Sequence, residues 1–192
     1  VIPQKSSHSK NEQYEGAYVK EPITGLHKWV MSFDLNSLYP HLIMQYNLSP
    51  ETLLKSCHQD ISVDDMLKGI KLNIPDKTTM TPNGALFRTD KQGFLPKMMQ
   101  ELYDERVVYK KKMLSAQQEY ENTKDKKYLK LISRYNNIQM ARKISLNSAY
   151  GAIGNQWFRY YDKAIAEGIT KSGQLSIRWI ENKLNKYLNN IL

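Results

Sequence analysis

The spacing of hydrophobic and polar positions changes along the chain, and the changes predict where its elements lie. Between residues 28 and 35, Trp29, Met31, Phe33 and Leu35 alternate with smaller or polar residues. This period-two pattern predicts a strand that ends in Asp34. Pro40 follows early enough to lie in the first turn of a helix, where its missing N–H costs no hydrogen bond. Asp34 is therefore predicted to lie where a strand passes into a helix.

From Pro96 onward the spacing becomes helical. Apolar or aromatic residues recur every three to four positions from 95 to 120, interrupted by Arg106, and again from 128 to 144. Polar residues 122–125 separate two predicted helices of about 25 residues, each about 37 Å long. So short a connection makes the two helices antiparallel neighbours in a hairpin that projects from a body. Gly151 is predicted to end the second helix.

The remaining segments give weaker signals. Residues 1–14 are polar and aperiodic, which predicts a linker, and Ser62 is predicted to cap a short helix within the poorly periodic stretch 47–80. Turn residues on either side of 85–88 predict a hairpin-like β element over 79–96. A third amphipathic helix is predicted over 163–191, with an inner face running from Ile165 to Ile191. The expected fold is α+β and mostly helical, with few strands and a long antiparallel two-helix hairpin.

Composition narrows the classes of function. Lys+Arg number 28 and Asp+Glu 19, a formal charge of +9 that favours a polyanionic partner. The single cysteine excludes a disulfide framework and a cysteine-based zinc site. No apolar run reaches the ~18 residues of a membrane-spanning helix, so no membrane partner is expected. The chain begins without Met or a signal-peptide pattern, and we expect it to be a piece of something longer.

Basic residues gather on facing sides of the predicted hairpin. Arg106 and Lys110 share one helix face, as do Lys143, Asn147 and Tyr150. In an antiparallel hairpin these two faces converge near its base. Three cations with an amide and an aromatic ring suit a triphosphate attached to a base. An ordinary solvated basic face remains the alternative.

Asp34 offers a second candidate site. Its carboxylate suits a hard cation such as Mg²⁺, and the helix that follows presents the free N–H groups of Ser37, Leu38 and Tyr39 to phosphate oxygens. The alternative is an acid that only caps the helix or ends the strand.

Two motifs resemble those of family B DNA polymerases, most of all those of the T-even-type bacteriophages. Residues 34–40 read D-L-N-S-L-Y-P, which is similar to motif A of the palm, and residues 143–151 read K-I-S-L-N-S-A-Y-G, which is similar to motif B of the fingers. The two motifs occur in the order found in that family. Further likeness at residues 1–4, 16–23, 30–34, 49–52 and 157–162 extends the resemblance over essentially the whole chain.

The resemblance implies roles for the first motif. Asp34 is expected to be a catalytic, metal-binding aspartate of a two-metal Mg²⁺ site, with the Leu35 carbonyl as a further ligand. The backbone of Ser37, Leu38 and Tyr39 is expected to hold the β- and γ-phosphates of an incoming dNTP. The Tyr39 ring is expected to lie under the sugar as a steric gate against a 2′-hydroxyl.

The resemblance also implies roles for the hairpin and the N-terminal segment. The triphosphate is expected to be clamped by Arg106, Lys110 and Lys143. Of these, Lys143 is also expected to be a catalytic residue. Asn147 is expected to support Tyr39 and the phosphates. The nascent base pair and the template are expected to be bordered by Tyr150, Gly151, Tyr14 and Gly16.

The same resemblance implies a division of the chain and a set of partners. Residues 1–27 are expected to lead into the palm from the template side, 28–95 to form part of the palm, 96–151 the fingers, and 152–192 a palm helix. Expected partners are primer-template DNA, dNTP, the remaining polymerase polypeptide and, through absent regions, replisome proteins such as a sliding clamp. The expected location is the cytoplasm of an infected bacterial host.

One departure from the family limits the expected activity. The second catalytic carboxylate of such polymerases lies in an Asp-Thr-Asp hairpin, and this sequence has none. The thumb and exonuclease regions are also missing. Since one carboxylate cannot hold two metal ions, the chain alone is predicted to be inactive. The alternatives are a non-enzymatic basic helical hairpin that binds nucleic acid through its charge, and a scaffold that binds nothing.

Overall fold

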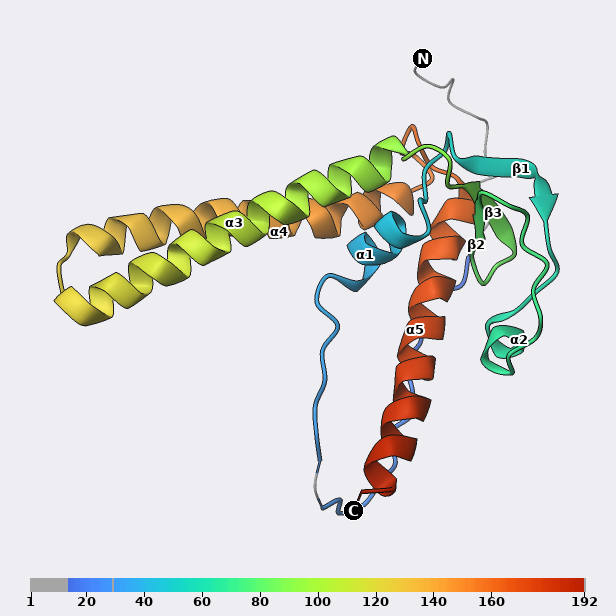
Figure 1. Ribbon diagram of the computed structural model, residues 1–192, viewed down its shortest axis with the longest axis horizontal. Coiled ribbons are helices and arrows are strands. Elements are labelled where there is room, and N and C mark those ends of the chain that lie inside the picture. Colours follow the sequence, from blue (N-terminus) through green and yellow to red (C-terminus); the bar gives the residue numbers. More distant parts are fainter. Residues whose placement is uncertain (1–13, 29, 192) are drawn as a thin grey trace.

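The computed structural model describes residues 14–28 and 30–191, which form five helices and three strands (Figure 1). In chain order these are α1 (Leu38–Gln45), β1 (Leu53–His58), α2 (Val63–Leu67), β2 (Thr78–Met80), β3 (Ala85–Arg88), α3 (Phe94–Thr123), α4 (Lys127–Ile153) and α5 (Lys163–Asn189). The predicted α+β, mostly helical class is confirmed. What was expected of residues 1–13 and of Trp29 lies outside the described residues. None of the described helices is both long and apolar enough to cross a membrane.

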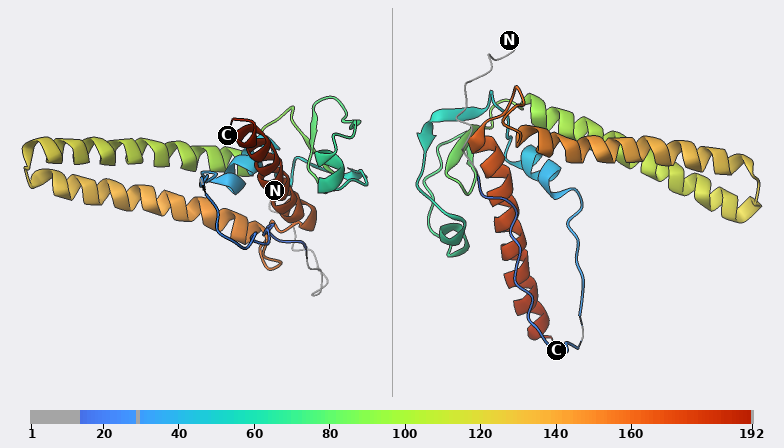
Figure 2. Two further views of the ribbon diagram at one scale, coloured as in Figure 1. Left: turned by 90° about the horizontal axis from the view of Figure 1, so that it is seen from below. Right: turned by 180° about the vertical axis from the view of Figure 1, so that it is seen from behind.

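Helices α3 and α4 form the predicted antiparallel hairpin, which projects from the rest of the molecule in every view (Figures 1 and 2). Lys124, in the left-handed conformation at φ 55°, ends α3 and starts the turn. An ion pair of 2.5 Å joins Glu105 to Arg142 across the hairpin. Arg106 is therefore level with residues near 142, as the spacing predicted.

The hydrophobic core lies at the base of the hairpin, where most of the elements meet. Ile43 of α1, Phe87 of β3, Met99 of α3, Leu146 of α4 and Ile169 of α5 are each at most 1% exposed. The outer part of the hairpin has few buried residues. The junction therefore holds the start of α1 and the end of α4 in a fixed relation.

The sheet is small and antiparallel, with strand order β1–β3–β2. The predicted hairpin is confirmed as β2 and β3, which pair from Thr78–Arg88 to Met80–Leu86. Gly84 closes their turn at φ +81°, and a Cβ there would lie 1.7 Å from the carbonyl oxygen of Gln59. Sequence analysis missed β1, because residues 53–58 do not alternate between apolar and polar side chains.

The predicted strand over residues 28–35 is wrong. No strand forms among its described residues, Lys28 and 30–35. Exposed fractions there are high, reaching 77% at Val30, 53% at Met31 and 62% at Phe33. Alternation selects an extended backbone, but a strand also requires the hydrogen bonds of a neighbour, and no described segment supplies them.

One helix boundary and one helix face also differ from the predictions. Gly151 does not end α4, which continues to Ile153, a residue only 1% exposed in the core, and Gly154 is its cap. The inner face expected along the third helix holds only in its first half. Ile165 and Ile169 are fully buried, whereas Trp179 and Tyr187 of the second half are 53% and 63% exposed.

Candidate functional site

A pocket of about 350 Å³ opens where the start of α1 meets the end of α4. Five of its lining residues come from the stretch around the start of α1 and two from α4. The lining residues are Leu35, Ser37, Leu38, Tyr39, Pro40, Asn147 and Tyr150. The structure therefore brings together parts of the two sequence motifs, which lie more than 100 positions apart.

Ser37 makes the turn into α1 in a conformation that is uncommon for a residue with a side chain. Its φ of 53° and ψ of 46° lie in the left-handed region, which costs on the order of 1–2 kcal/mol for a non-glycine residue. Arg106 donates from Nη1 to Ser37 Oγ over 3.0 Å. His41 donates its backbone N–H to the Ser37 carbonyl, and its Nδ1 lies 2.9 Å from the same oxygen. These contacts hold the turn in place.

The turn leaves hydrogen-bond donors free at the pocket. Leu38 and Tyr39 are the first two residues of α1, so their N–H groups have no acceptor within the helix. Pro40, which lacks an N–H, occupies the third position of the first turn, as predicted. Together with the helix dipole, these donors favour an anion at the pocket.

Two tyrosines line the pocket, and a third, Tyr14, lies beside Tyr150. The rings of Tyr39 and Tyr150 lie 4.4 Å apart between centroids and are tilted by 44°. Burial raises the pKa of both phenols, and the nearby phenol of Tyr14 raises the pKa of Tyr150 further. Tyr39 and Tyr150, which both line the pocket, therefore carry neutral hydroxyl groups at neutral pH.

The three predicted cations differ in their contacts, and of them Arg106 bonds to a residue that lines the pocket, Ser37. Arg106 is half-buried, and its Nε is buried without a hydrogen-bond partner in the described part of the chain. Lys110 and Lys143 are exposed, and neither pairs with an acid of residues 14–28 or 30–191. All three charges are therefore available to an anion.

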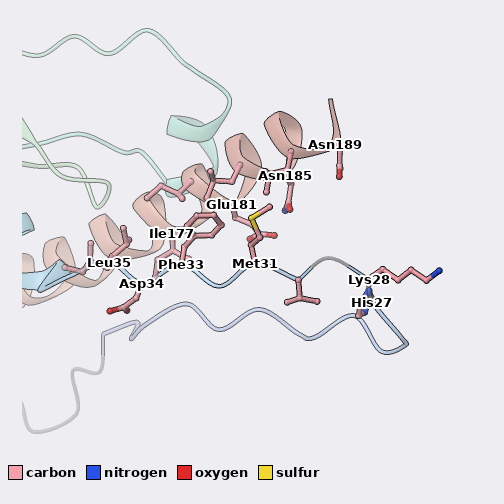
Figure 3. A pocket seen from close by; sticks show the side chains of 15 residues that line it. His27, Lys28, Met31, Phe33, Asp34, Leu35, Ile177, Glu181, Asn185 and Asn189 are labelled. Atoms are coloured by element: carbon pink, nitrogen blue, oxygen red, sulfur yellow. The ribbon is translucent and has the colours of Figure 1, made fainter. Parts of the chain in front are cut away.

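Asp34 lies beside this pocket and not in its wall. It lines a larger groove of about 820 Å³ between residues 27–38 and the second half of α5. Met31 and Phe33 point towards α5, while Asp34 points to the other side (Figure 3). Leu35 borders both the groove and the pocket. The side-chain alternation predicted for this segment is therefore present, although the strand is not.

The acidic groups near the pocket are too few for a two-metal site. No cluster of three or more His, Cys, Asp or Glu occurs within the described residues. Asp34 and the Leu35 carbonyl are the expected ligands, and one carboxylate does not balance two divalent cations. The described residues alone therefore do not fit a Mg²⁺ pair, and sequence analysis expected one carboxylate of the two-metal site to be missing from this chain.

Gly16 and Gly151, the remaining predicted residues, are not among those that line the pocket. Gly16 accepts a hydrogen bond from Gln174 Nε2 over 2.8 Å, and Gly151 is exposed on α4 with open space beside it. Sequence analysis missed Gly154, where a Cβ would lie 2.2 Å from Tyr14 Oη. A glycine near the end of a helical pattern was the available signal for such a close approach.

Comparison with known proteins identifies related chains. The family model for DNA polymerase family B matches residues 1–191. The DNA-directed DNA polymerases of Escherichia phage RB69 and Enterobacteria phage T4 are 35% and 33% identical over the whole chain, which spans 26% of their length. The structure of the family B DNA polymerase from the archaeon Pyrobaculum calidifontis matches with a TM-score of 0.65 at 26% identity, covering 96% of this chain and 21% of that one.

Proposed function

The chain belongs to DNA polymerase family B, and from that premise we propose that it forms the palm-and-fingers part of a DNA-directed DNA polymerase. In this proposal residues 28–95 and 152–192 belong to the palm, 96–151 form the fingers, and 1–27 lead in from the template side. The pocket between α1 and α4 takes the incoming dNTP. Primer-template DNA and the remaining polymerase polypeptide are its partners, and the cytoplasm of an infected bacterium is its location.

The contact between Arg106 and Ser37 carries the proposal. It joins a cation of the fingers hairpin to the turn whose free N–H groups face the pocket. A triphosphate at this turn meets backbone donors from α1 and guanidinium donors from α3 at once. Within the described residues Arg106 Nε has no hydrogen-bond partner, so the guanidinium keeps donor capacity beyond its bond to Ser37.

Each group of the site has a separate task in nucleotide binding. The N–H groups at the start of α1 hold phosphate oxygens, and Arg106, Lys110 and Lys143 neutralise their charge. The Tyr39 ring lies under the sugar and leaves no room for a 2′-hydroxyl. Asn147 orients Tyr39 and the phosphates, while Tyr150, Gly151, Tyr14 and Gly16 border the base pair and template.

Magnesium enters the proposal only together with further polypeptide. Asp34 and the Leu35 carbonyl supply one side of a metal site, and a second carboxylate has to come from outside the described residues. Bound metal ions would stabilise the charge that develops during nucleotidyl transfer. We therefore expect no primer extension by this chain alone.

Primer extension tests this proposal. The chain is assembled with the polypeptide that completes the polymerase and is given primer-template, dNTPs and Mg²⁺. We expect extension by the assembly, none by the chain alone, and a loss of at least about 100-fold on Asp34→Asn or Lys143→Ala. The control is Lys130→Ala, an exposed lysine in the outer part of α4.

The outcomes separate the proposal from its main alternative. Extension by the isolated chain contradicts the predicted inactivity, and undiminished extension by the two variants contradicts the site. Affinity for duplex DNA that falls steeply with salt and does not respond to dNTP would favour a non-enzymatic basic hairpin.

A further inference from the structure

Gly173 of α5 stands directly behind the Tyr39 ring, and we propose that this glycine sets how far Tyr39 reaches into the pocket. By fixing that depth, Gly173 determines how strongly the site discriminates between deoxyribose and ribose. The inference rests on the proposed function, because it takes Tyr39 as the group that meets the sugar.

The distances leave no space for a side chain at Gly173. A Cβ there would lie 2.8 Å from Cε1, 3.6 Å from Cδ1 and 3.8 Å from Cζ of Tyr39. The first distance is well below the ~3.5 Å at which two carbon atoms make favourable contact. Any larger residue at this position therefore displaces either the ring or the helix.

The helix backbone is the less able of the two to move. Ser172, Gly173 and Gln174 are buried, and Gln174 Nε2 donates to the Gly16 carbonyl over 2.8 Å. Thr170, one turn earlier, donates to the Glu15 carbonyl over 2.8 Å. Hydrogen bonds to the N-terminal segment thus hold the turn of α5 that contains Gly173 on both sides. A larger residue at position 173 would therefore displace the Tyr39 side chain and not the helix.

The direction of that displacement is also constrained. Tyr150 also packs on the ring, at a centroid distance of 4.4 Å that is already at the short end of the range for aromatic pairs. The ring therefore cannot move towards Tyr150. It moves into the pocket that both tyrosines line, and the space beside the sugar becomes smaller.

A double-mutant cycle in the thermal unfolding of the 192-residue chain tests the contact without any ligand. Alanine is a better helix residue than glycine, so Gly173→Ala favours folding unless the Tyr39 ring opposes it. We expect Gly173→Ala to lower Tm by about 2–4 °C when Tyr39 is present and not to lower it in a Tyr39→Val background.

Gly168→Ala is the matched control on the same helix. Its Cβ would meet Thr81 and Asn83, and no atom of Tyr39 is among its nearest neighbours. Its effect on Tm is expected to be equal in both backgrounds. Equal effects of Gly173→Ala in the two backgrounds would overturn the inferred contact.

A nucleotide-protection assay then tests sugar selection. Lys143 is modified by an acylating reagent in the presence of increasing dATP or ATP, and the half-protecting concentration of each is measured. Displacing a side chain by about 30° from its rotamer costs about 0.5–1.5 kcal/mol, which corresponds to roughly a two- to tenfold change in a dissociation constant. We expect Gly173→Ala to raise the half-protecting concentrations of both nucleotides by that factor, and that of ATP more than that of dATP. In a Tyr39→Val background, Gly173→Ala is expected to change neither concentration.

The two ways of failing are distinguishable. If the unsubstituted chain shows no protection by dATP, the proposed nucleotide site is wrong, and the inference falls with it. If the unsubstituted chain is protected and Gly173→Ala leaves the ratio between ATP and dATP unchanged, only the role of Gly173 is overturned.

Discussion

Tyr39 is the residue that we expect to select between deoxyribose and ribose. Its ring lines the pocket, and its contacts with Tyr150 and Gly173 fix its position. Replacement by valine keeps an apolar side chain and removes the ring. We predict that Tyr39→Val in the assembled polymerase lowers discrimination against ribonucleotides by at least about tenfold, since the steric block is gone. The measurement is the ratio of kcat/KM for dATP to that for ATP.

Tyr109 offers the matched control for that prediction. It lies on α3, further along the hairpin than Arg106, where its ring pairs with Tyr135 at 6.2 Å. Tyr109→Val removes a comparable aromatic contact outside the pocket and is expected to leave the ratio unchanged. A Tyr39→Val enzyme that still rejects ATP as strongly as before would contradict the steric-gate assignment.

Residues of the site differ in how far the sequence could predict them. Arg106 and Asn147 follow from helical spacing and from a hairpin whose register is fixed by its short turn. Asp34 was expected to join them, but it is a lining residue of the neighbouring groove and not of the pocket. Gly154 and Gly173 could not be predicted, because their contacts depend on how α4 and α5 lie against distant segments, which no local spacing determines.

At the scale of elements, the end of α4 carries its part of the site through Leu146, which is 1% exposed in the core beside Asn147. We predict that Leu146→Ala lowers the free energy of unfolding by about 2–5 kcal/mol, because it removes buried apolar volume. Ile144, two residues earlier, is 58% exposed, and Ile144→Ala is expected to cost less than about 1 kcal/mol. Urea denaturation monitored by circular dichroism measures both, and equal costs would contradict the docking of α4 on the core.

Helix α2 depends on the capping box formed by Ser62 and Asp65, of which sequence analysis predicted the Ser62 cap. Hydrogen bonds from the side chain and backbone of Ser62 hold the pKa of the Asp65 carboxyl below its ordinary 3.8. A folded-state pKa below the unfolded value contributes stability above the unfolded pKa. That contribution is lost as the pH falls through the folded value.

We therefore predict that the amides of α2 lose protection against hydrogen exchange below about pH 4, before those of α5 do. Asp65→Asn is expected to remove this pH dependence, and Ser62→Ala to weaken the helix at every pH by about 1 kcal/mol. Protection of α2 that is independent of pH between 7 and 3 in the unsubstituted chain would show that the capping box does not support the helix.

Elements marked by apolar spacing or by turn residues were predicted well, whereas a strand that depends on hydrogen bonds from a neighbouring strand was not. Helices α3, α4 and α5 follow from apolar spacing, and β2–β3 from its turn residues. Residues 30–35 have the alternation of a strand and lack a neighbour among the described residues. A sequence pattern specifies which side chains share a face, but it does not specify what that face packs against.

At the scale of the whole molecule, the groove of about 820 Å³ beside α5 leaves apolar side chains open to solvent. Val30, Met31 and Phe33 on one side and Ile177 and Leu184 on the other contribute to its lining. Because the chain spans 26% of the length of its phage relatives, we propose that further palm strands of the polymerase cover this groove and pair with residues 30–35.

Hydrogen exchange provides the test of that surface. We predict that the amides of residues 30–35 exchange rapidly in the isolated chain and become protected at least about 10-fold on assembly with the remaining polypeptide. Residues 115–126 in the outer part of the hairpin serve as the internal control and are expected not to change. Unchanged exchange at 30–35 in an assembly that extends primers would contradict the proposed pairing.

The charge of +9 also has a more specific interpretation at this scale. Arg106 lies at the base of the hairpin and bonds to Ser37, while Lys110 of α3 and Lys143 of α4 form no ion pair within the described residues. We therefore assign these three cations to a triphosphate, whereas a non-enzymatic basic hairpin would use them to bind a DNA backbone. A ligand that carries a triphosphate on a small molecule distinguishes the two directly.

Protection of Lys143 from acylation by dATP in the 192-residue chain is the measurement that tests the nucleotide site most directly. We predict that dATP protects Lys143 and Lys110 in a dose-dependent way and does not protect Lys130 in the outer hairpin. In the Lys143→Ala variant, the protection of Lys110 is expected to be lost. Protection by short duplex DNA but not by dATP, or equal protection of all three lysines, would contradict the account.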